Sequence, residues 1–134
     1  MTTDDPGSLP AAMVADYMDQ GLLENIILMF RHDPGLYPMV AELLQDERIR
    51  VRMGAVALVE SLAELDPGGM SVIATAVAPL LTDPSATIRG DAAYAVGLTG
   101  TPAHLEPLRG LLADPFADVR EIAADAVAAI SSRD

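Results

Sequence analysis

Apolar residues recur at helical spacing in three similar stretches of the chain, and the charged residues of each stretch fall at the positions between them. In each stretch five positions fall within one half of a helical wheel, which predicts an amphipathic helix with a buried stripe. The stripe residues are Val51, Ala55, Val56, Val59 and Leu62 in the first stretch, Ile88, Ala92, Ala93, Val96 and Thr99 in the second, and Val119, Ala123, Ala124, Val127 and Ile130 in the third. The small alanines favour a close approach of neighbouring helices.

A second amphipathic segment precedes each of these helices, over residues 36 to 44, 70 to 81 and 102 to 112. Each unit is therefore predicted to be an antiparallel pair, and we name its members helix A and helix B in chain order. A residue before proline avoids the helical backbone, so Asp-Pro dipeptides favour helix junctions. The chain has four of them, at Asp33-Pro34, Asp66-Pro67, Asp83-Pro84 and Asp114-Pro115.

The three units share a phrase of fixed spacing where helix B begins. Two leucines and one further residue lead to Asp46, Asp83 and Asp114, and an arginine follows six residues after each aspartate, at Arg52, Arg89 and Arg120. The phrase defines repeats at 35–65, 69–99 and 102–131, preceded by a degenerate helix pair at 9–34. Such a period predicts stacked helix pairs, so that residues 9–134 form a single domain behind a flexible acidic tail at 1–8.

The order of residues 80 to 93 is Leu-Leu-x-Asp, four residues, Ile-Arg, two residues and Ala-Ala. This pattern resembles HEAT-like repeats of the phycobilisome-lyase type. The resemblance implies an all-α fold, a right-handed α-solenoid of antiparallel helix pairs whose B helices line a concave face. HEAT-like proteins include scaffolds, adaptors, chromophore-lyase subunits, a metal-dependent hydroxylase and DNA glycosylases, so the resemblance implies the fold more closely than the function.

The repeated aspartates and arginines are interpreted as structural rather than catalytic. Arginine does not give up its proton near neutral pH, whereas its planar fork suits bonds to aspartate side chains and carbonyl groups of adjacent repeats. The resemblance implies a ladder along the stack, formed by Asp46, Arg52, Asp83, Arg89, Asp114 and Arg120.

Charge and composition narrow the classes of partner. With 20 acidic and 8 basic residues the net charge is -12, which repels phosphate backbones and anionic lipids and argues against nucleic acid and membranes as partners. The chain has no cysteine, so disulfides and thiolate ligands are excluded. The first residues do not resemble a secretory signal, and the longest apolar run, 70 to 81, is too short to span a bilayer. A cytoplasmic location is expected.

The face of the B helices opposite the buried stripe varies between repeats and is the predicted binding surface. Tyr94 lies at its centre, with apolar and acidic residues around it. The candidate binding residues are Arg50, Met53, Asp91, Tyr94, Leu98, Glu121, Ile122 and Asp125. An apolar anchor inside an acidic rim is typical of a site for a basic or amphipathic protein segment. The other interpretation is that Tyr94 packs along a solvated helix face and the acidic residues only keep the protein soluble.

Catalytic motifs are sparse. His32 and His104 have no partner at metal-ligand spacing, and the chain lacks the repeated His-Glu dipeptides that hold iron in HEAT-like hydroxylases. It also lacks a glycine-rich phosphate loop and a serine-nucleophile motif. We therefore expect no metal and no other cofactor.

The sequence favours a non-enzymatic protein-protein interaction adaptor or scaffold. Its partner is expected on the concave B-helix face or at an exposed end of the stack. The alternative is an accessory subunit of a chromophore-lyase-type enzyme. A monomer or a weak homodimer is expected, because the last helix, 119 to 130, has no following repeat to cover it.

Overall fold

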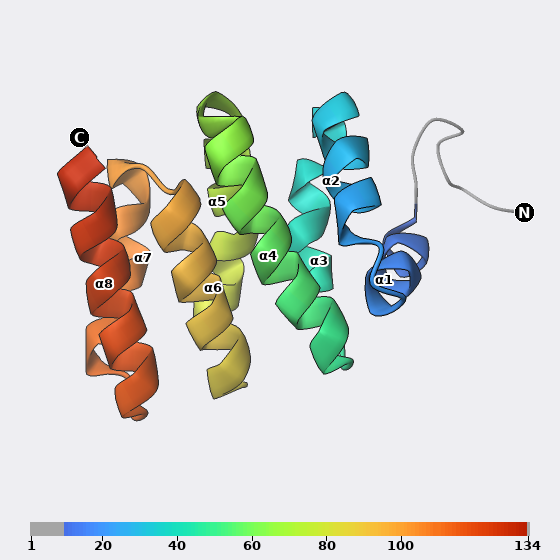
Figure 1. Cartoon of the computed structure of the whole chain (residues 1–134). Helices are drawn as coiled ribbons and strands as arrows, with labels where there is room; N and C mark the ends of the chain where they lie inside the picture. The colour runs from blue at the N-terminus through green and yellow to red at the C-terminus, as the bar shows by residue number, and fades with distance from the viewer. Residues whose placement is uncertain (1–9, 134) are drawn as a thin grey trace, which may run out of the picture.

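The computed structural model describes residues 10–133 and consists there of helices without strands. An N-terminal pair, α1 (Ala11–Asp19) and α2 (Leu23–His32), is joined through Gly21, whose φ of 84° suits glycine. Three B helices then lie side by side, α4 (Ile49–Leu65), α6 (Ala86–Thr99) and α8 (Ala117–Arg133) (Figure 1). The all-α solenoid predicted from the sequence is confirmed. The predicted tail at 1–8 lies outside the described residues.

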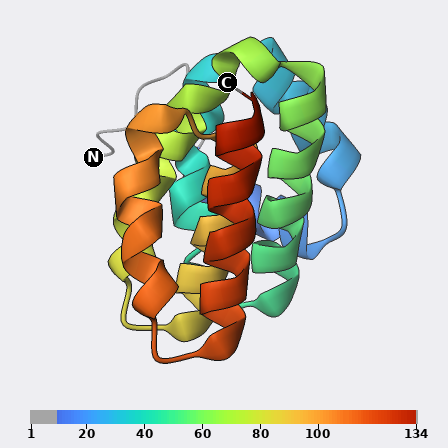
Figure 2. The same ribbon diagram turned by 90° about the vertical axis from the view of Figure 1, so that its left-hand side faces the viewer.

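The A helices form the second layer and are less regular than the B helices (Figures 1 and 2). Each combines α and 3-10 segments. The segments are η1 (Pro34–Met39) and α3 (Val40–Leu43) in the first repeat, η2 (Pro67–Gly69), α5 (Met70–Val77) and η3 (Ala78–Thr82) in the second, and η4 (Pro102–His104), α7 (Leu105–Gly110) and η5 (Leu111–Ala113) in the third. Pro38 and Pro79 lie within 3-10 segments, where the missing proline N–H interrupts the α-helical bonding pattern.

The repeated aspartate closes the turn between helix A and helix B. Its carboxylate accepts a hydrogen bond from the backbone N–H two residues later, at 2.9 Å in all three repeats, from Arg48 to Asp46, from Ser85 to Asp83 and from Phe116 to Asp114. A short acidic side chain that binds its own backbone in this way favours a tight turn. The aspartate therefore recurs because each repeat needs it to form its own turn between helix A and helix B.

The repeated arginine holds the same turn from the other side. One guanidinium nitrogen, Nη1, donates to the carbonyl oxygen of the aspartate and to that of the next residue. The pairs of distances are 2.7 and 2.9 Å for Arg52, 2.9 and 3.1 Å for Arg89, and 2.7 and 3.2 Å for Arg120. These carbonyls belong to the arginine's own repeat, so the expectation of carbonyls from an adjacent repeat was wrong.

The ladder between repeats has one rung among the described residues. Arg89 donates from Nε and Nη2 to the two carboxylate oxygens of Asp114 in the next repeat, at 2.8 and 3.2 Å. Arg52 makes no such bond to Asp83, and Arg120 binds no carboxylate within residues 10–133. The expected continuous ladder is therefore reduced to the pair Arg89–Asp114.

The buried apolar residues form one cluster that runs from Val14 in α1 to Ile130 in α8. The predicted stripe is buried or partly buried except at Ala124, which is exposed. This prediction was wrong because no described helix covers the side of α8 that corresponds to the side of α6 on which Ala93 is buried. Thr99, the polar member of the stripe, is buried and donates from its hydroxyl to the Ala95 carbonyl at 2.8 Å.

Helices α6 and α8 pack closely together at Gly97 and Ala126. A methyl group placed on Gly97 would lie 2.8 Å from the Ala126 side chain and 3.0 Å from its Cα. Glycine is therefore needed here for packing rather than for backbone freedom. The close contact brings the two helices together at their buried edges and leaves a furrow on their exposed face.

Within residues 10–133, no single helix has the length and apolar character needed to cross a bilayer. One pair of segments, Ile49–Leu65 and Pro67–Thr82, is long and apolar enough when taken together, but the chain bends by 115° at the break between them.

Candidate functional site

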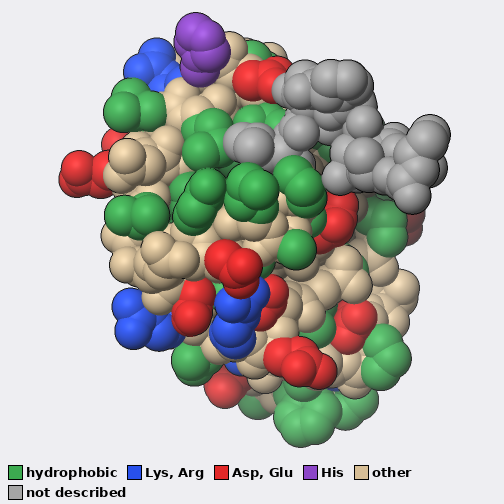
Figure 3. Space-filling model, turned by 90° about the vertical axis from the view of Figure 1, so that its right-hand side faces the viewer, with side chains coloured by type: hydrophobic (Ala, Val, Ile, Leu, Met, Phe, Trp, Pro, Cys, Tyr) green, Lys and Arg blue, Asp and Glu red, His purple; other side chains and the backbone are tan. Residues whose placement is uncertain are grey.

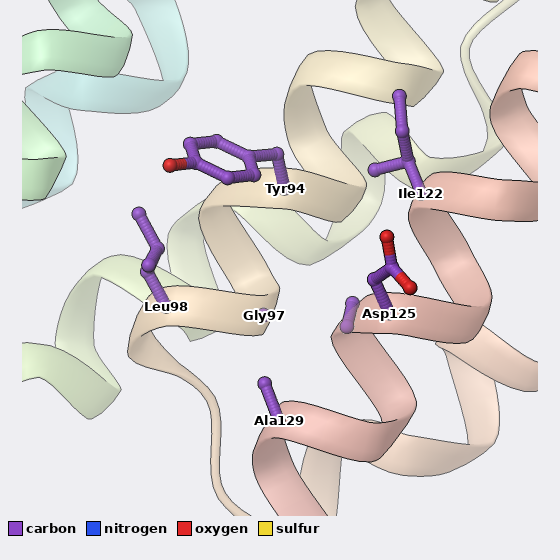
Figure 4. Close-up of a pocket in the computed structure, with 7 residues that line it drawn as sticks. Tyr94, Gly97, Leu98, Ile122, Asp125 and Ala129 are labelled. Carbon is purple, nitrogen blue, oxygen red and sulfur yellow. The ribbon is translucent and has the colours of Figure 1, made fainter.

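An apolar pocket of about 200 Å³ opens on the exposed face between α6 and α8 (Figure 4). Tyr94 and Leu98 stand on the α6 side, Ile122 and Asp125 stand on the α8 side, and Gly97 lies between them (Figure 4). We call this the apolar pocket, lined by Tyr94, Gly97, Leu98, Ile122, Asp125, Ala126 and Ala129. Because Gly97 and Ala126 have small side chains, the floor of the pocket is close to the helix backbones.

A second pocket, of about 360 Å³, lies next to the first toward the N-terminal ends of the same helices. We call it the acidic pocket, lined by Ala86, Thr87, Gly90, Asp91, Phe116, Asp118, Val119 and Ile122. Ile122 borders both pockets, and we name the two together the α6–α8 groove. At the edge of the groove the Arg89 guanidinium stands 5.9 Å from the centre of the exposed Phe116 ring, within the range of a cation–π contact.

The hydroxyl of Tyr94 is engaged by the neighbouring repeat. It donates a hydrogen bond to a carboxylate oxygen of Glu60 in α4 at 2.5 Å. This bond, together with burial and the charge of Glu60, raises the pKa of Tyr94 above its ordinary value of 10.0. Tyr94 is 38% exposed and lines the apolar pocket, with its ring directed away from α8 (Figure 4). Tyr94 offers the groove an apolar surface rather than a free hydroxyl.

Asp91 is a partly buried carboxylate that makes no hydrogen bond or ion pair with the residues that the structure describes. Burial raises its pKa, and the positive charge of Arg52 in α4 acts in the opposite direction and lowers it. A carboxylate that loses hydration without gaining a partner is costly in its charged form. A nearby positive charge therefore stabilises the ionised form of Asp91.

The groove contains five of the eight residues that the sequence selected. Tyr94, Leu98, Ile122 and Asp125 line the apolar pocket, and Asp91 lines the acidic pocket.

The other three candidates lie outside the linings of both pockets. Glu121 and Met53 are exposed, Met53 with 65% of its surface open to solvent. Arg50 extends toward the N-terminal pair, since a methyl group on Gly21 would lie 4.0 Å from its Nη2. Asp118 and Glu60 were not among the eight candidates. Asp118 lies in the first turn of α8, and Glu60 belongs to the preceding repeat.

The N-terminal end of the stack carries a second feature that sequence reasoning missed. Arg48 binds Asp46 at 3.0 Å and Asp16 of α1 at 2.9 Å, and so links the N-terminal pair to the first repeat. Figure 3 views this end and shows hydrophobic side chains across its middle, above a group of acidic and basic ones. The exposed apolar residues of α1 and α2, with the loop between them, include Met13, Leu22 and Leu28.

The two histidines are separate, and one has a clear structural role. His104 accepts a hydrogen bond at Nδ1 from the Thr101 backbone N–H at 3.0 Å, and its Nε2 lies 3.2 Å from the Thr75 hydroxyl. The contact with Thr101 caps the start of the third A helix. Among residues 10–133, no group of three or more histidine, aspartate or glutamate side chains is arranged to hold a metal ion.

A sequence profile of HEAT repeats matches residues 56–128, more than half of the chain. The chain belongs to the HEAT-repeat family. The matched span covers most of α4, the whole second repeat and most of the third, and so contains the complete α6–α8 groove apart from Ala129.

Among curated proteins, the chain is similar to a deoxyhypusine hydroxylase from Phaeosphaeria nodorum. The two sequences are 32% identical over 93 aligned residues. The alignment covers 66% of this HEAT-repeat chain and 28% of the relative, so the chain spans a little over a quarter of the length of that protein. Neither comparison bears on the alternative function, an accessory subunit of chromophore-lyase type, which stays a prediction.

Proposed function

We propose that this HEAT-repeat protein is a non-enzymatic interaction scaffold that holds a basic, amphipathic segment of another protein in the α6–α8 groove. The proposal rests on one observation, that an apolar pocket and an acidic pocket lie next to each other. An apolar pocket of about 200 Å³ adjoins a pocket whose partly buried carboxylate, Asp91, has no partner among the described residues. Protein interfaces commonly combine an apolar core with a polar rim, and aromatic and arginine side chains are frequent anchors within them.

The charge of the molecule supports a basic partner. The net charge is -12, and Glu60, Asp118, Glu121 and Asp125 are exposed on the B helices around the groove. Acidic surfaces of this kind attract basic segments over distances comparable to the Debye length, which is about 8 Å at physiological ionic strength. Binding is therefore expected to weaken as salt is added, while the apolar pocket maintains part of the affinity.

An interaction role also fits the way in which the repeated residues are used. Asp46, Asp83 and Asp114 close turns, and their arginines hold the same turns, so these recurrent charged groups are engaged in maintaining the fold. The similarity to a deoxyhypusine hydroxylase covers about a quarter of that protein. His32 and His104 are followed by Asp33 and Leu105, so the His-Glu dipeptides expected of a HEAT-like hydroxylase are missing from this sequence.

Site-specific crosslinking in the source cell tests the proposal. Thr87 is exposed at the acidic pocket, and Val72 is exposed on α5 in the layer of A helices. A photoreactive p-benzoylphenylalanine at position 87 should give a discrete crosslinked protein, whereas the same group at position 72 should not. Tyr94→Ala should reduce the yield at position 87. Equal crosslinking at both positions, or a yield insensitive to Tyr94→Ala in the folded protein, would contradict the proposal.

A further inference from the structure

The α6–α8 groove has a direction, because its two pockets follow one another along parallel helices. Gly90 faces Ile122 and Gly97 faces Ala126, so residue numbers increase the same way on both sides. The acidic pocket lies toward the N-terminal ends, at Asp91 and Asp118, and the apolar pocket lies toward the C-terminal ends, at Leu98 and Ala129. A segment lying along the groove therefore meets charge at one end and apolar surface at the other.

The spacing of the pockets follows from the helices that form them. Asp91 and Leu98 are seven residues apart on α6, which is about 10 Å at the helical rise of roughly 1.5 Å per residue. On the facing helix Asp118 and Asp125 are also seven residues apart and stand on the same side. A partner helix parallel to these has the same rise, so its residues i and i+7, two turns apart on one face, match the two pockets.

The acidic pocket prefers a cation for two reasons. Asp91 lacks a hydrogen-bond partner among the described residues, and the nearby Arg52 has its Nη1 committed to the Asp46 and Glu47 carbonyls. Asp118, across the pocket, is exposed and also unpaired within the described chain. An arginine side chain placed between them could donate to both carboxylates with its planar fork, an arrangement that a lysine reproduces less well.

Resting on the function proposed above, we propose that the partner is an amphipathic helix that places an arginine in the acidic pocket and an aliphatic side chain, seven positions away on the same face, in the apolar pocket. The arginine pairs with Asp91 and Asp118. The aliphatic side chain packs against Leu98, Ile122 and the Tyr94 ring. The small residues Gly97 and Ala126 below it leave the depth that such a side chain needs.

Fluorescence anisotropy with designed peptides tests this assignment. The probe is a labelled, alanine-rich helical peptide of about 15 residues that carries one arginine and one leucine at i and i+7. Control peptides replace the arginine by glutamine, replace the leucine by alanine, or move the leucine two positions onto another face of the helix. The protein variants are Asp91→Asn and Asp118→Asn for the acidic pocket and Ala129→Leu, which fills the apolar pocket. Thermal melts of all three variants accompany the titrations.

The expected results form two independent double-mutant cycles, each pairing one protein substitution with one peptide substitution. Asp91→Asn should raise the Kd of the probe about tenfold, equivalent to about 1.4 kcal/mol, and leave the glutamine peptide unchanged. Ala129→Leu should weaken the probe by a similar factor and leave the peptide without leucine unchanged. Moving the leucine should weaken binding to the wild type as much as removing it.

Each negative result identifies a different part of the proposal as wrong. If Asp91→Asn and Asp118→Asn affect the probe and the glutamine peptide equally, the arginine assignment is wrong. If moving the leucine has no effect, the i, i+7 spacing is wrong. No binding of any peptide, combined with discrete crosslinking at position 87, would overturn the helical partner and leave the proposed scaffold function in place. The absence of that crosslink would overturn the function itself.

Discussion

The hydroxyl of Tyr94 in α6 donates a hydrogen bond to the carboxylate of Glu60 in α4, so that one side chain of the groove is positioned by the preceding repeat. The bond stabilises the protonated hydroxyl and raises the pKa of Tyr94. Glu60→Gln removes the negative acceptor and should lower the pKa of Tyr94 toward its ordinary value of 10.0. An NMR titration of Cζ-labelled tyrosine measures this shift. Tyr37 is the internal control, because its hydroxyl binds Asp66 and not Glu60. An unchanged Tyr94 titration in Glu60→Gln would show that the bond does not form in solution.

The pair Arg89–Asp114 is expected to contribute more to stability than the other repeated arginines do. Its side chains are 13% and 4% exposed, and removal of Arg89 leaves a buried carboxylate without its cation. Arg89→Ala should lower the melting temperature by about 10 °C. Arg120→Ala is the matched control, because Arg120 makes the same two carbonyl contacts without an ion pair to another repeat. The melting temperature of Arg120→Ala should fall by less than half as much as that of Arg89→Ala. Equal effects of the two substitutions would assign the stability to the turn rather than to the pair.

The same pair predicts the response to acid. The hydrogen bonds from Arg89 hold the pKa of Asp114 below its usual 3.8. The unfolded carboxyl therefore takes up its proton at a higher pH than the folded one, so the stabilisation is present above about pH 4 and is lost as the pH falls through the folded pKa. The difference in unfolding free energy between wild type and Asp114→Asn should shrink as the pH falls below about 4. Denaturant titrations at several pH values test it, and a constant difference would contradict it.

Gly97 is expected to tolerate no larger residue. A methyl group there meets Ala126 at 2.8 Å, so Gly97→Ala must separate α6 and α8 despite the higher helix propensity of alanine. We expect a loss of about 1 to 2 kcal/mol in the free energy of unfolding by chemical denaturation. Gly68→Ala is the control, because nothing lies within 4 Å of the added methyl group, and it should change stability by less than about 0.5 kcal/mol. Similar losses for both variants would mean that helix spacing is not limited at Gly97.

Tyr37 makes stability sensitive to alkali. Burial, the hydrogen bond to Asp66 at 2.7 Å and the negative charge of Asp66 raise the pKa of Tyr37 to about 12. In the unfolded chain the hydroxyl ionises near its ordinary value of 10.0, while the folded protein keeps the proton. Stability should therefore fall between about pH 10 and pH 12. Tyr37→Phe removes this part of the decline, and comparison of unfolding curves for the two proteins isolates it. If the stabilities of wild type and Tyr37→Phe decline in parallel, the alkaline sensitivity belongs to groups other than Tyr37.

Much of the fold could be predicted because the repeated phrase fixes the register of each B helix. Val51, Ala55 and Val59 are buried as their spacing requires, and so are Ala92, Ala93 and Val96. Ala124 could not be placed correctly, because its exposure depends on whether another repeat follows rather than on its own position in the pattern. Arg52 and Arg120 share the sequence context of Arg89, but neither binds a carboxylate of another repeat among the described residues, because such a bond depends on how neighbouring repeats are placed.

The candidate site was predicted in part, through positions that share a helix face. Asp91, Tyr94 and Leu98 lie on one side of α6, and Ile122 and Asp125 face them from α8. The spacing could not show that Glu60 holds the Tyr94 hydroxyl, because that contact depends on the offset between α4 and α6. It also could not show that Arg50 turns toward Gly21, since long side chains choose their direction from local tertiary contacts.

The central claim is that the α6–α8 groove is the binding surface, and an NMR titration tests it most directly. Amide spectra of the isotope-labelled protein are recorded with increasing amounts of the peptide that carries arginine and leucine at i and i+7. The account predicts progressive shifts for Gly90, Asp91, Gly97 and Ile122, with Val72 and its neighbours on α5 unchanged. The largest shifts on the A helices or at the N-terminal pair, or no shifts at concentrations that saturate the anisotropy signal, would contradict it.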